Sequence, residues 1–547
     1  MHRNSKNEIS VTLFLYPLLA FILSFTLLQL NSYVTDDGTD YLRIAQNFIA
    51  GKGLSLIPGE PFTVHLPLYP LLTGIFSKVF FDNVEFAGHF VSILSFSLTL
   101  LPLFLLSQTI YGPKTAQWSC FLYLTSGFLL IYSNLILTEP LFIFLIMTLL
   151  WLVQQILEEE NPRVWQGLAL GINAELAYFT RPEGFFYYLV ALASILLSSS
   201  KRSWRSKLRT ALISLIPFLL LFLPYLNFFH KTTGHWQLSG GVLLEVIRRQ
   251  LDVSHPGQYL EVKKQIEGLS TDKTQLKIHE LAETFGLWHW IAADHFALLR
   301  SIPNTFLMRT LEFNRYFYAG LGFFLIGAGF LKPPWNPRRK KSEVLLILSL
   351  LPFVPHLIVV FDQRRYLPLY PIFLIWMGNG IESVRHWAQK SFNLNHRASM
   401  GIALSICLFL ALPSAVYLRD RLGSSPVPPE HKEMGLWMKN HIPRIEEEKV
   451  TTHRGFVTLY SGAHVVFLPY VEKLEDLVTY MRHKNSRYFV VSEDLDTPVR
   501  DSYRSLLDEN RPPPPGLTRE HVIRGKTKVI LYKLLAGKDS FGLRKSS

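Results

Sequence analysis

Hydrophobic positions are gathered into long blocks that are nearly free of charge, for example at 11–30, 87–107 and 398–418. Apolar runs of about 17–25 residues are long enough to cross the hydrocarbon of a bilayer as a helix. By this criterion the sequence predicts about eleven spans. They lie near 11–30, 87–107, 116–133, 138–157, 164–180, 184–200, 210–229, 316–331, 343–361, 366–384 and 398–418. The predicted fold class is therefore a polytopic α-helical membrane protein.

Basic residues in the short connections predict which side of the membrane each loop occupies. One cluster comprises Lys201, Arg202, Arg205, Lys207 and Arg209, and a second comprises Lys332, Arg338, Arg339, Lys340 and Lys341. Short loops rich in Lys and Arg remain in the cytoplasm. With the N-terminus inside, both clusters fall inside. The segments predicted to lie outside are 31–85, 134–139, 181–183, 230–315, 362–365 and the region after 419.

The apolar stretch 66–81 is treated differently, because counting it as a span would invert every later loop. The stretch is short and contains Pro67 and Pro70. We predict that it forms a helix lying at the outer interface.

The tail changes character and predicts a second domain. Helix-like stretches at 433–441 and 474–482 alternate with strand-like stretches at 465–468 and 487–492. The predicted organisation is a membrane domain at 1–420, with a first outer loop at 31–85 and a large outer loop at 230–315. A small extracytoplasmic α/β domain follows at 421–547.

Charge and cysteine content exclude several other classes. The net charge of +13 could suggest nucleic acid. The basic residues lie mostly in short loops between apolar blocks, however, so no nucleic-acid partner is expected. Cys120 and Cys407 both lie in apolar blocks, which indicates neither a disulfide framework nor a metal cluster. The sequence has no Walker loop, dinucleotide fingerprint or HExxH motif.

Paired carboxylates follow the first span, at Asp36 and Asp37, ahead of a helix-like stretch from Tyr41. A carboxylate at this place can act as general base on a hydroxyl if burial or a partner tunes its pKa. The alternative is a cap for the following helix.

Further charged residues begin later spans on the same predicted face. Glu139 precedes Pro140, which suits a first helical position, so a cap is again the alternative. Arg181 could bind a phosphate bidentately and Glu183 could orient it, or the two could form a plain surface pair. Glu175 lies inside the preceding span, where an acid is a functional candidate by default.

Two more positions complete the set. His65 opens the interfacial segment and could contact a lipid phosphate, or could be a solvated surface histidine. Arg364 and Arg365 lie on the outer face against the positive-inside tendency. A phosphate ligand would explain that exception, and so would headgroup anchoring.

The order of these motifs resembles the GT-C glycosyltransferases, in the branch of protein O-mannosyltransferases and aminoarabinose (lipid A) transferases. The resemblance spans roughly 10–420 and rests on a set of short motifs. They are Asp36-Asp37, Tyr41-Leu42-Arg43-Ile44-Ala45, Gly51-Lys52-Gly53, His65-Leu66-Pro67-Leu68, Thr138-Glu139-Pro140, Thr180-Arg181-Pro182-Glu183-Gly184 and Arg365-Tyr366-Leu367-Pro368. Leu66 departs from the family, which has proline there.

The resemblance implies the GT-C fold and an inverting transfer of a monosaccharide from a polyprenyl-phosphate donor to a hydroxyl. The catalytic residues would be Asp37 or Asp36, with Glu139 as the second acid. Donor and substrate contacts would come from His65, Tyr41, Arg181, Glu183, Arg364, Arg365 and Tyr366. The close branch generally works without a metal, so no cofactor is expected, although the Asp36-Asp37 pair leaves a divalent cation open.

The predicted partners are the bilayer, the lipid-linked donor and an acceptor that is a protein, lipid A or an envelope glycan. The basic inner loops suit a bacterial inner membrane, with the active face towards the periplasm or exterior. Two rival functions remain. One is a transporter or flippase, and the other is a non-catalytic subunit of envelope polysaccharide assembly.

Overall fold

A computed structural model describes residues 2–30, 32–61, 64–198, 202–239, 320–355, 363–422, 427–471, 473–495 and 501–535, with isolated positions between 241 and 303. Contacts divide the chain into two compact units. The first unit comprises Met1–Tyr33, Thr63–Arg249 and Trp290–Ser425, and the second comprises Val34–Phe62, Gln250–His289 and Pro426–Ser547. The predicted boundary at 420/421 stays a prediction, and most of the predicted outer loop 230–315 falls outside the described residues.

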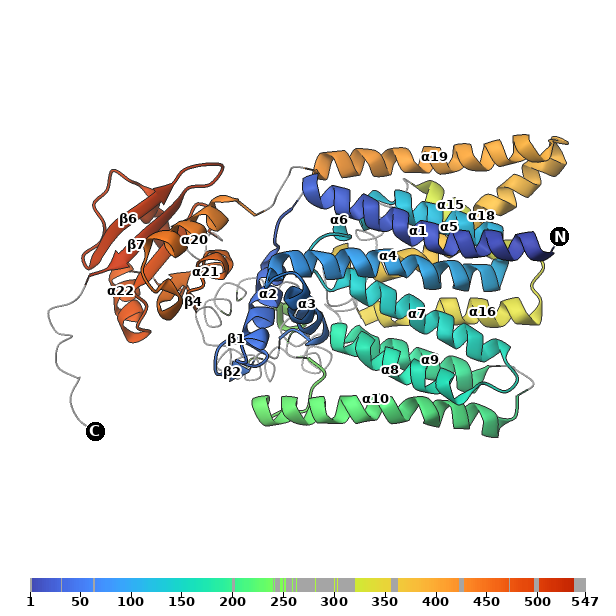
Figure 1. Ribbon diagram of the computed structural model, residues 1–547, viewed down its shortest axis with the longest axis horizontal. Coiled ribbons are helices and arrows are strands. Elements are labelled where there is room, and N and C mark those ends of the chain that lie inside the picture. The colour runs from blue at the N-terminus through green and yellow to red at the C-terminus, as the bar shows by residue number, and fades with distance from the viewer. Residues whose placement is uncertain are drawn as a thin grey trace. The chain divides into compact units, whose positions relative to one another are not determined.

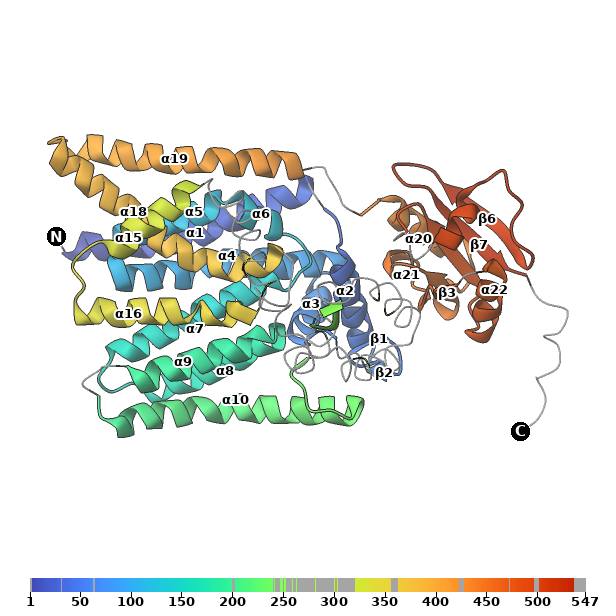
Figure 2. The same ribbon diagram turned by 180° about the vertical axis from the view of Figure 1, so that it is seen from behind.

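The first unit is a bundle of long helices that run roughly alongside one another (Figures 1 and 2). Its helices are α1 (His2–Leu30), α3 (Leu68–Val79), α4 (Val84–Tyr111), α5 (Pro113–Thr125), α6 (Gly127–Tyr132), α7 (Glu139–Glu158), α8 (Val164–Thr180), α9 (Glu183–Leu197), α10 (Trp204–Thr233), α15 (Leu321–Leu331), α16 (Pro337–Leu348), α18 (Tyr370–Ser391) and α19 (His396–Arg421). Short 3-10 turns, η2 (Leu351–Phe353) and η3 (Gln363–Leu369), precede α18. Each predicted span contains helical structure within its described part, and the predicted span 343–361 is interrupted between the end of α16 at Leu348 and η2.

Five of the described helices are long and apolar enough to cross a membrane, namely α1, α4, α7, α10 and α19. Within that set, α4 and α7 are 72% and 78% buried in their most apolar windows, whereas α1, α10 and α19 are each 22% buried. The first two are therefore interior helices, and the other three present apolar side chains to their surroundings, as helices in contact with lipid do. The span count of about eleven stays a prediction.

The chain departs from the predicted single helix at 116–133. Ser126 adopts an extended backbone, with φ −74° and ψ 105°, and separates α5 from α6. Its hydroxyl accepts a hydrogen bond from the amide of Leu129 and so caps α6. A serine that caps a helix competes with continuation of the preceding helix, which hydropathy alone does not register.

The connections in the bundle agree with the predicted grouping of basic loops. The N-terminus and the α9–α10, α15–α16 and α18–α19 connections lie at one end of this unit (Figures 1 and 2). The start of α7 and the junction of α8 with α9 lie at the other end. This second end carries Glu139, Arg181 and Glu183.

The second unit contains a five-stranded sheet with the order β4-β3-β5-β7-β6. The strands are β3 (Lys449–Thr452), β4 (His464–Phe467), β5 (Tyr488–Ser492), β6 (Leu517–Ile523) and β7 (Val529–Leu534). Strands β4, β3 and β5 are parallel, whereas β7 is antiparallel to both β5 and β6. The helix and strand stretches predicted in the tail are present as α20 (Glu430–His441), β4, α22 (Leu474–His483) and β5. Its extracytoplasmic location stays a prediction.

Helices cover both faces of this sheet, which is why β5 is buried along its whole length. Phe489 and Val491 pack with Leu477 and Met481 of α22. Tyr488 and Val490, which point to the opposite face, pack with α20 and with α21 (Phe456–Ser461). The same unit includes α2 (Asp36–Ile49) and a short hairpin, β1 (Ser55–Ile57) and β2 (Glu60–Pro61).

Candidate active site

Three chain segments of the helical unit meet in a network of ion pairs. Arg181 ends α8, Glu183 begins α9 and Glu139 begins α7. Arg181 Nη1 donates to Glu139 Oε1 at 2.8 Å, and Arg181 Nη2 donates to Glu183 Oε1 at 2.9 Å. The side chains are only 7%, 2% and 11% exposed, so these charges are shielded from water.

Two further arginines reach the network from η3. Arg365 Nη1 lies 3.4 Å from Glu183 Oε1, and Arg364 Nε lies 3.7 Å from Glu139 Oε1. We call Glu139, Arg181, Glu183, Arg364 and Arg365 the arginine cluster. Among the described residues, three guanidinium groups meet two carboxylates in this cluster.

The members of the arginine cluster differ in accessibility. Burial opposes the charge of Arg181, but Glu183 and Glu139 outweigh it and raise the pKa of Arg181. Arg364 and Arg365 are 24% and 23% exposed, about three times as much as Arg181. Arg181 therefore organises the two carboxylates, while Arg364 and Arg365 are better placed to meet an anion.

Glu139 does not serve as the cap that its position suggested. Thr138 occupies the N-cap position of α7 without a side-chain capping bond, and the Glu139 carboxylate turns to Arg181 instead. Its other oxygen, Oε2, is buried and accepts no hydrogen bond from the described residues. Such an unsatisfied acceptor is costly unless a ligand or water supplies a donor.

His65 and Tyr366 are the remaining predicted contacts of the helical unit. His65 is half-buried in the non-helical segment just ahead of α3. The Tyr366 ring packs against the Phe353 ring with centroids 4.6 Å apart. Their contacts to a donor stay predictions.

The second unit places Asp36 and Asp37 in the first turn of α2. The capping role falls to Thr35, whose hydroxyl accepts from the Gly38 amide at 3.0 Å. The N-cap of α2 is therefore Thr35, and neither Asp36 nor Asp37 has the capping role that was the alternative for them. Tyr41, one turn later, is 5% exposed and belongs to the core of the unit.

The aspartates of α2 line an open pocket of about 580 Å³ together with residues of the tail. The lining residues are Asp36, Asp37, Asp40, His453, Arg454, Gly455, Phe467, Asp494 and Leu495. Arg454 Nη1 lies 3.8 Å from Asp36 Oδ1 and 3.4 Å from Asp494 Oδ2. Arg454 thus bridges a residue of α2 to a residue of the loop that follows β5.

The pocket shifts the acidity of two of its carboxyl groups in opposite directions. Burial, together with the charges of Asp37, Asp40 and Asp494, raises the pKa of Asp36 despite the attraction of Arg454. Burial would also raise the pKa of Asp494, but hydrogen bonds from His431 and Ser492 and the charge of Arg454 hold it well below the ordinary value. A raised pKa is what a carboxylate needs to accept a proton from a hydroxyl.

Sequence reasoning missed His453, Arg454 and Asp494 as site residues. Their position directly after β3 and β5 could have identified them, because loops at the carboxyl ends of parallel strands carry functional side chains. The sequence analysis did not predict the strand at 449–452, so it could not identify His453 and Arg454 as residues at a strand end.

Across the described part of the chain, no group of three or more His, Cys, Asp or Glu residues has an arrangement that could hold a metal ion. The acidic pocket is instead bridged by the guanidinium of Arg454.

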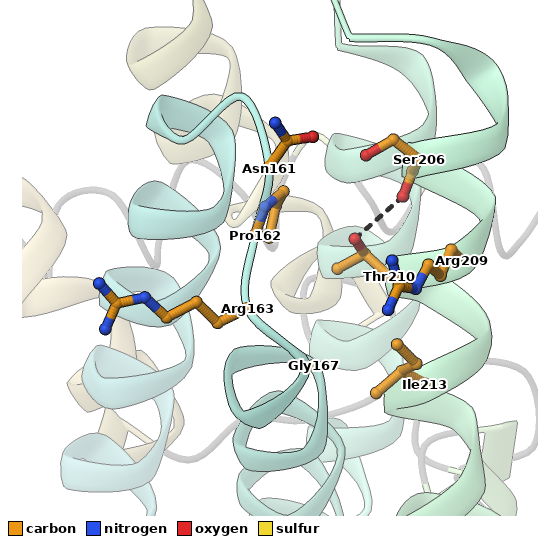
Figure 3. A pocket seen from close by; sticks show the side chains of 8 residues that line it. All are labelled: Asn161, Pro162, Arg163, Gly167, Ser206, Arg209, Thr210 and Ile213. Carbon is orange, nitrogen blue, oxygen red and sulfur yellow. Dashed lines mark hydrogen bonds between the residues drawn. The ribbon is translucent and has the colours of Figure 1, made fainter.

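A much smaller pocket, of about 40 Å³, lies between the α7–α8 connection and the start of α10 (Figure 3). Arg163, which lines it, caps the beginning of α8, whereas Arg181 caps its end. A helix of this length separates the two by about 25 Å. The small pocket is therefore remote from the arginine cluster and has no room for a sugar.

Comparison with known proteins agrees with this architecture. The family model for dolichyl-phosphate-mannose-protein mannosyltransferase matches residues 64–228, a stretch that includes His65, Glu139, Arg181 and Glu183. No curated protein matches the chain by sequence.

Solved structures share the fold at low sequence identity. ArnT from Cupriavidus metallidurans bound to undecaprenyl phosphate matches with 12% identity and a TM-score of 0.58, over 95% of this chain and 97% of that one. The oligosaccharyltransferase AglB from Archaeoglobus fulgidus, in complex with an inhibitory peptide and a dolichol-phosphate, matches with 15% identity and a TM-score of 0.58. That match covers 87% of this chain and 69% of AglB. A second structure of the archaeal enzyme, in complex with Zn and sulfate, has 14% identity, a TM-score of 0.57 and coverage of 87% and 67%.

The resemblance drawn from the order of the motifs is thereby confirmed at the level of the superfamily. Residues 64–228 match the mannosyltransferase family, and the fold is similar to that of ArnT over 95% of the chain and to that of AglB over 87%. The similarity to glycosyltransferases thus rests on sequence for residues 64–228 and on fold for the rest of the matched chain.

Proposed function

We propose that the protein transfers a monosaccharide from a polyprenyl-phosphate donor to a hydroxyl acceptor, with inversion, at the outer face of a bacterial inner membrane. The observation that carries the proposal is the arginine cluster, where Arg364 and Arg365 remain 24% and 23% exposed beside two buried carboxylates. Planar guanidinium groups bind phosphate oxygens bidentately. The ligands named for the ArnT and AglB structures, undecaprenyl phosphate and a dolichol-phosphate, belong to the same chemical class as the lipid phosphate of the proposed donor.

In this reaction the acceptor O–H gives its proton to Asp37 or Asp36, and the oxygen attacks the anomeric carbon. The bond from that carbon to the phosphate oxygen breaks, and the polyprenyl phosphate leaves with the electron pair. Arg364 and Arg365 stabilise the charge that develops on the leaving phosphate, because fixed cations in a site with little water oppose charge build-up most strongly. Arg181 and Glu183 hold the guanidinium groups of Arg364 and Arg365 in position, and Glu139 supplies the second acid.

The family resemblance maps the acid to Asp37 or its neighbour Asp36. Both aspartates lie in the first turn of α2 and line the same pocket. Replacing each in turn is therefore the direct test.

The test is an assay of sugar transfer from a labelled polyprenyl-phosphate hexose in membranes that contain the full chain. We expect Asp37→Asn or Asp36→Asn to lower transfer by about 10²-fold or more, the range that a positioned general base supplies. Asp82→Asn is the matched control, since Asp82 pairs with Lys78 at the surface and is 64% exposed. Full activity in both variants would overturn the assignment of the base.

The transporter alternative has one observation in its favour. Glu175 is fully buried inside α8, and neither carboxylate oxygen has a hydrogen-bond partner among the described residues. A transporter would need this acid, because intramembrane carboxylates carry protons or ions. Glu175→Gln separates the two functions. Sugar transfer that persists in Glu175→Gln supports the glycosyltransferase. Loss of lipid flipping in Glu175→Gln, together with unchanged sugar transfer in Asp37→Asn, supports the transporter.

A further inference from the structure

The small pocket of Figure 3 lies where α8 and α10 separate from close contact. The two helices touch at Gly167, since a Cβ atom there would lie 2.8 Å from an Ile213 methyl group and 3.3 Å from the Thr210 carbonyl oxygen. Asn161 and Ser206 lie at the other end of the pocket, where their side chains point toward one another (Figure 3). We call this space the α8–α10 pocket.

The α8–α10 pocket offers hydrogen-bond donors to a ligand. The Asn161 amide, the Ser206 hydroxyl and the Arg209 guanidinium line it, and these side-chain groups have no hydrogen-bond or ion-pair partner among the described residues. The side chain of Arg163 points away from Asn161 and Ser206, so it adds charge at the rim only (Figure 3). The volume of about 40 Å³ is roughly three times what one ordered water needs, which suits a single polar group such as a phosphate.

Two buried cations lie close to this lining. Arg202 is 9% exposed, and its Nη2 donates at 3.1 Å to the hydroxyl of Thr210, which lines the pocket. Its Nε is buried without a hydrogen-bond partner among the described residues. Lys207, next to Ser206 in the sequence, is 8% exposed and donates to the Ser198 carbonyl. Both cations therefore bond to neutral oxygens, and a buried charge without a counter-charge is costly unless an anion approaches it.

The acids nearest in sequence do not neutralise these cations. Glu158 binds Arg338 at 2.8 Å, and Glu159 accepts a hydrogen bond from Gln166 at 2.9 Å. Glu160 is exposed. The basic residues of the two connections that meet here outnumber these acids, and the described ones are Arg163, Arg202, Arg205, Lys207 and Arg209.

Two exposed tryptophans place the pocket at the level of lipid headgroups. Trp165 is the second residue of α8 and Trp204 is the first residue of α10, and they are 51% and 59% exposed. Tryptophan gathers where the hydrocarbon of a bilayer meets water, because its ring is apolar and its N–H is polar. The phosphate groups found at this level belong to phospholipids.

We propose that the α8–α10 pocket binds the phosphate of an anionic phospholipid, with Arg209, Ser206 and Asn161 as its donors. The surrounding basic residues favour a headgroup with net negative charge over a zwitterionic one. The site lies at the opposite end of α8 from the arginine cluster and does not depend on the proposed function.

The experiment measures lipid retention by the full chain in detergent, using native mass spectrometry. The probes are phosphatidylglycerol and phosphatidylcholine with the same acyl chains. We expect the unmodified protein to bind phosphatidylglycerol more tightly. Arg209→Gln should weaken that binding about fivefold, the share that one basic residue contributes near an anionic lipid. Ser206→Ala should weaken it about threefold, as the loss of one hydrogen bond does.

Arg397→Gln is the matched control, because Arg397 is an exposed arginine in the first turn of α19, at the same end of the bundle, and does not line the pocket. It should bind phosphatidylglycerol as the unmodified protein does. Equal binding of the two lipids by the unmodified protein would overturn the proposal without any variant, and so would equal binding of phosphatidylglycerol by Arg209→Gln and Arg397→Gln. Displacement of phosphatidylglycerol by an equal concentration of inorganic phosphate would also overturn it, since the pocket would then be a site for a free anion.

Discussion

Arg181 Nη1 lies 2.8 Å from Glu139 Oε1 and joins the end of α8 to the start of α7. Both side chains are almost fully buried, at 7% and 2% exposure. Because Arg181 also pairs with Glu183, a single guanidinium compensates two buried carboxylates. The stability of this end of the bundle should therefore depend strongly on one residue.

Arg181→Ala should lower the free energy of unfolding by about 3–5 kcal/mol, the cost of leaving a buried partner charge uncompensated. The measurement is thermal unfolding of the full chain in detergent. Arg338→Ala is the control, since Arg338 is 66% exposed in its pair with Glu158. Loss of that surface pair should cost about 0–1 kcal/mol. Equal losses in the two variants would show that burial of the Arg181 pairs is not what stabilises the bundle.

Arg364→Ala and Arg365→Ala should weaken donor binding more than they affect folding. Arg364 and Arg365 lie 3.7 Å and 3.4 Å from their carboxylates and are 24% and 23% exposed, so a phosphate can reach both guanidinium groups from solvent. We expect KM for a polyprenyl-phosphate hexose to rise about tenfold, and Lys to restore part of the loss because it keeps the charge without the fork. Arg419→Ala, which removes a 76% exposed arginine paired with Asp420, should leave KM unchanged. An unchanged KM in both cluster variants would contradict phosphate binding there.

Asp494 should make the protein sensitive to acid. Its pKa in the folded state lies well below the ordinary value of 3.8, because hydrogen bonds and nearby positive charge outweigh burial. A depressed pKa contributes stability that is present above the unfolded pKa and is lost as the pH falls below it. Asp494→Asn should therefore be less stable than the unmodified chain at pH 7 and should lose less stability between pH 5 and pH 3.

Melting temperatures of the full chain across this pH range measure the effect. Asp508→Asn is the control, because Asp508 is 43% exposed and its pair with Arg511 lies at the surface. That variant should keep the pH dependence of the unmodified chain. A variant at Asp494 with the same acid sensitivity as the control would show that the contacts from His431, Ser492 and Arg454 do not stabilise the carboxylate.

Gly171 should tolerate no side chain, because α8 and α10 approach closely at this point. A Cβ atom on Gly171 would lie 1.9 Å from the Ser214 carbonyl oxygen and 2.7 Å from the Pro217 ring. Gly171→Ala should therefore force the two helices apart and lower the melting temperature, with a loss of about 1–3 kcal/mol. Gly327→Ala in α15 is the matched control, since a Cβ there meets nothing within 4 Å and alanine favours the helix. The same melting temperature for both variants would contradict close packing of α8 on α10.

Much of the helical unit could be predicted from the sequence, because the information is local. Apolar blocks such as 138–157 and 164–180 coincide with α7 and α8 within a residue or two. A run of apolar side chains must leave water as a helix, since only a helix satisfies its backbone hydrogen bonds within one segment. The placement of Glu139, Arg181 and Glu183 at helix ends follows from the same runs, because a charged residue ends an apolar block.

The partners of those residues came only from the tertiary structure. The sequence left open whether Arg181 binds Glu183 alone, and the fold adds Glu139, 42 residues away. The pocket lined by Asp36 and Arg454 shows the same limit more strongly, since these two residues are separated by most of the chain. Strand order and the contacts of α2 with the tail are set by pairing and packing between distant segments, and no local pattern of hydrophobic and polar positions encodes which distant charges will meet.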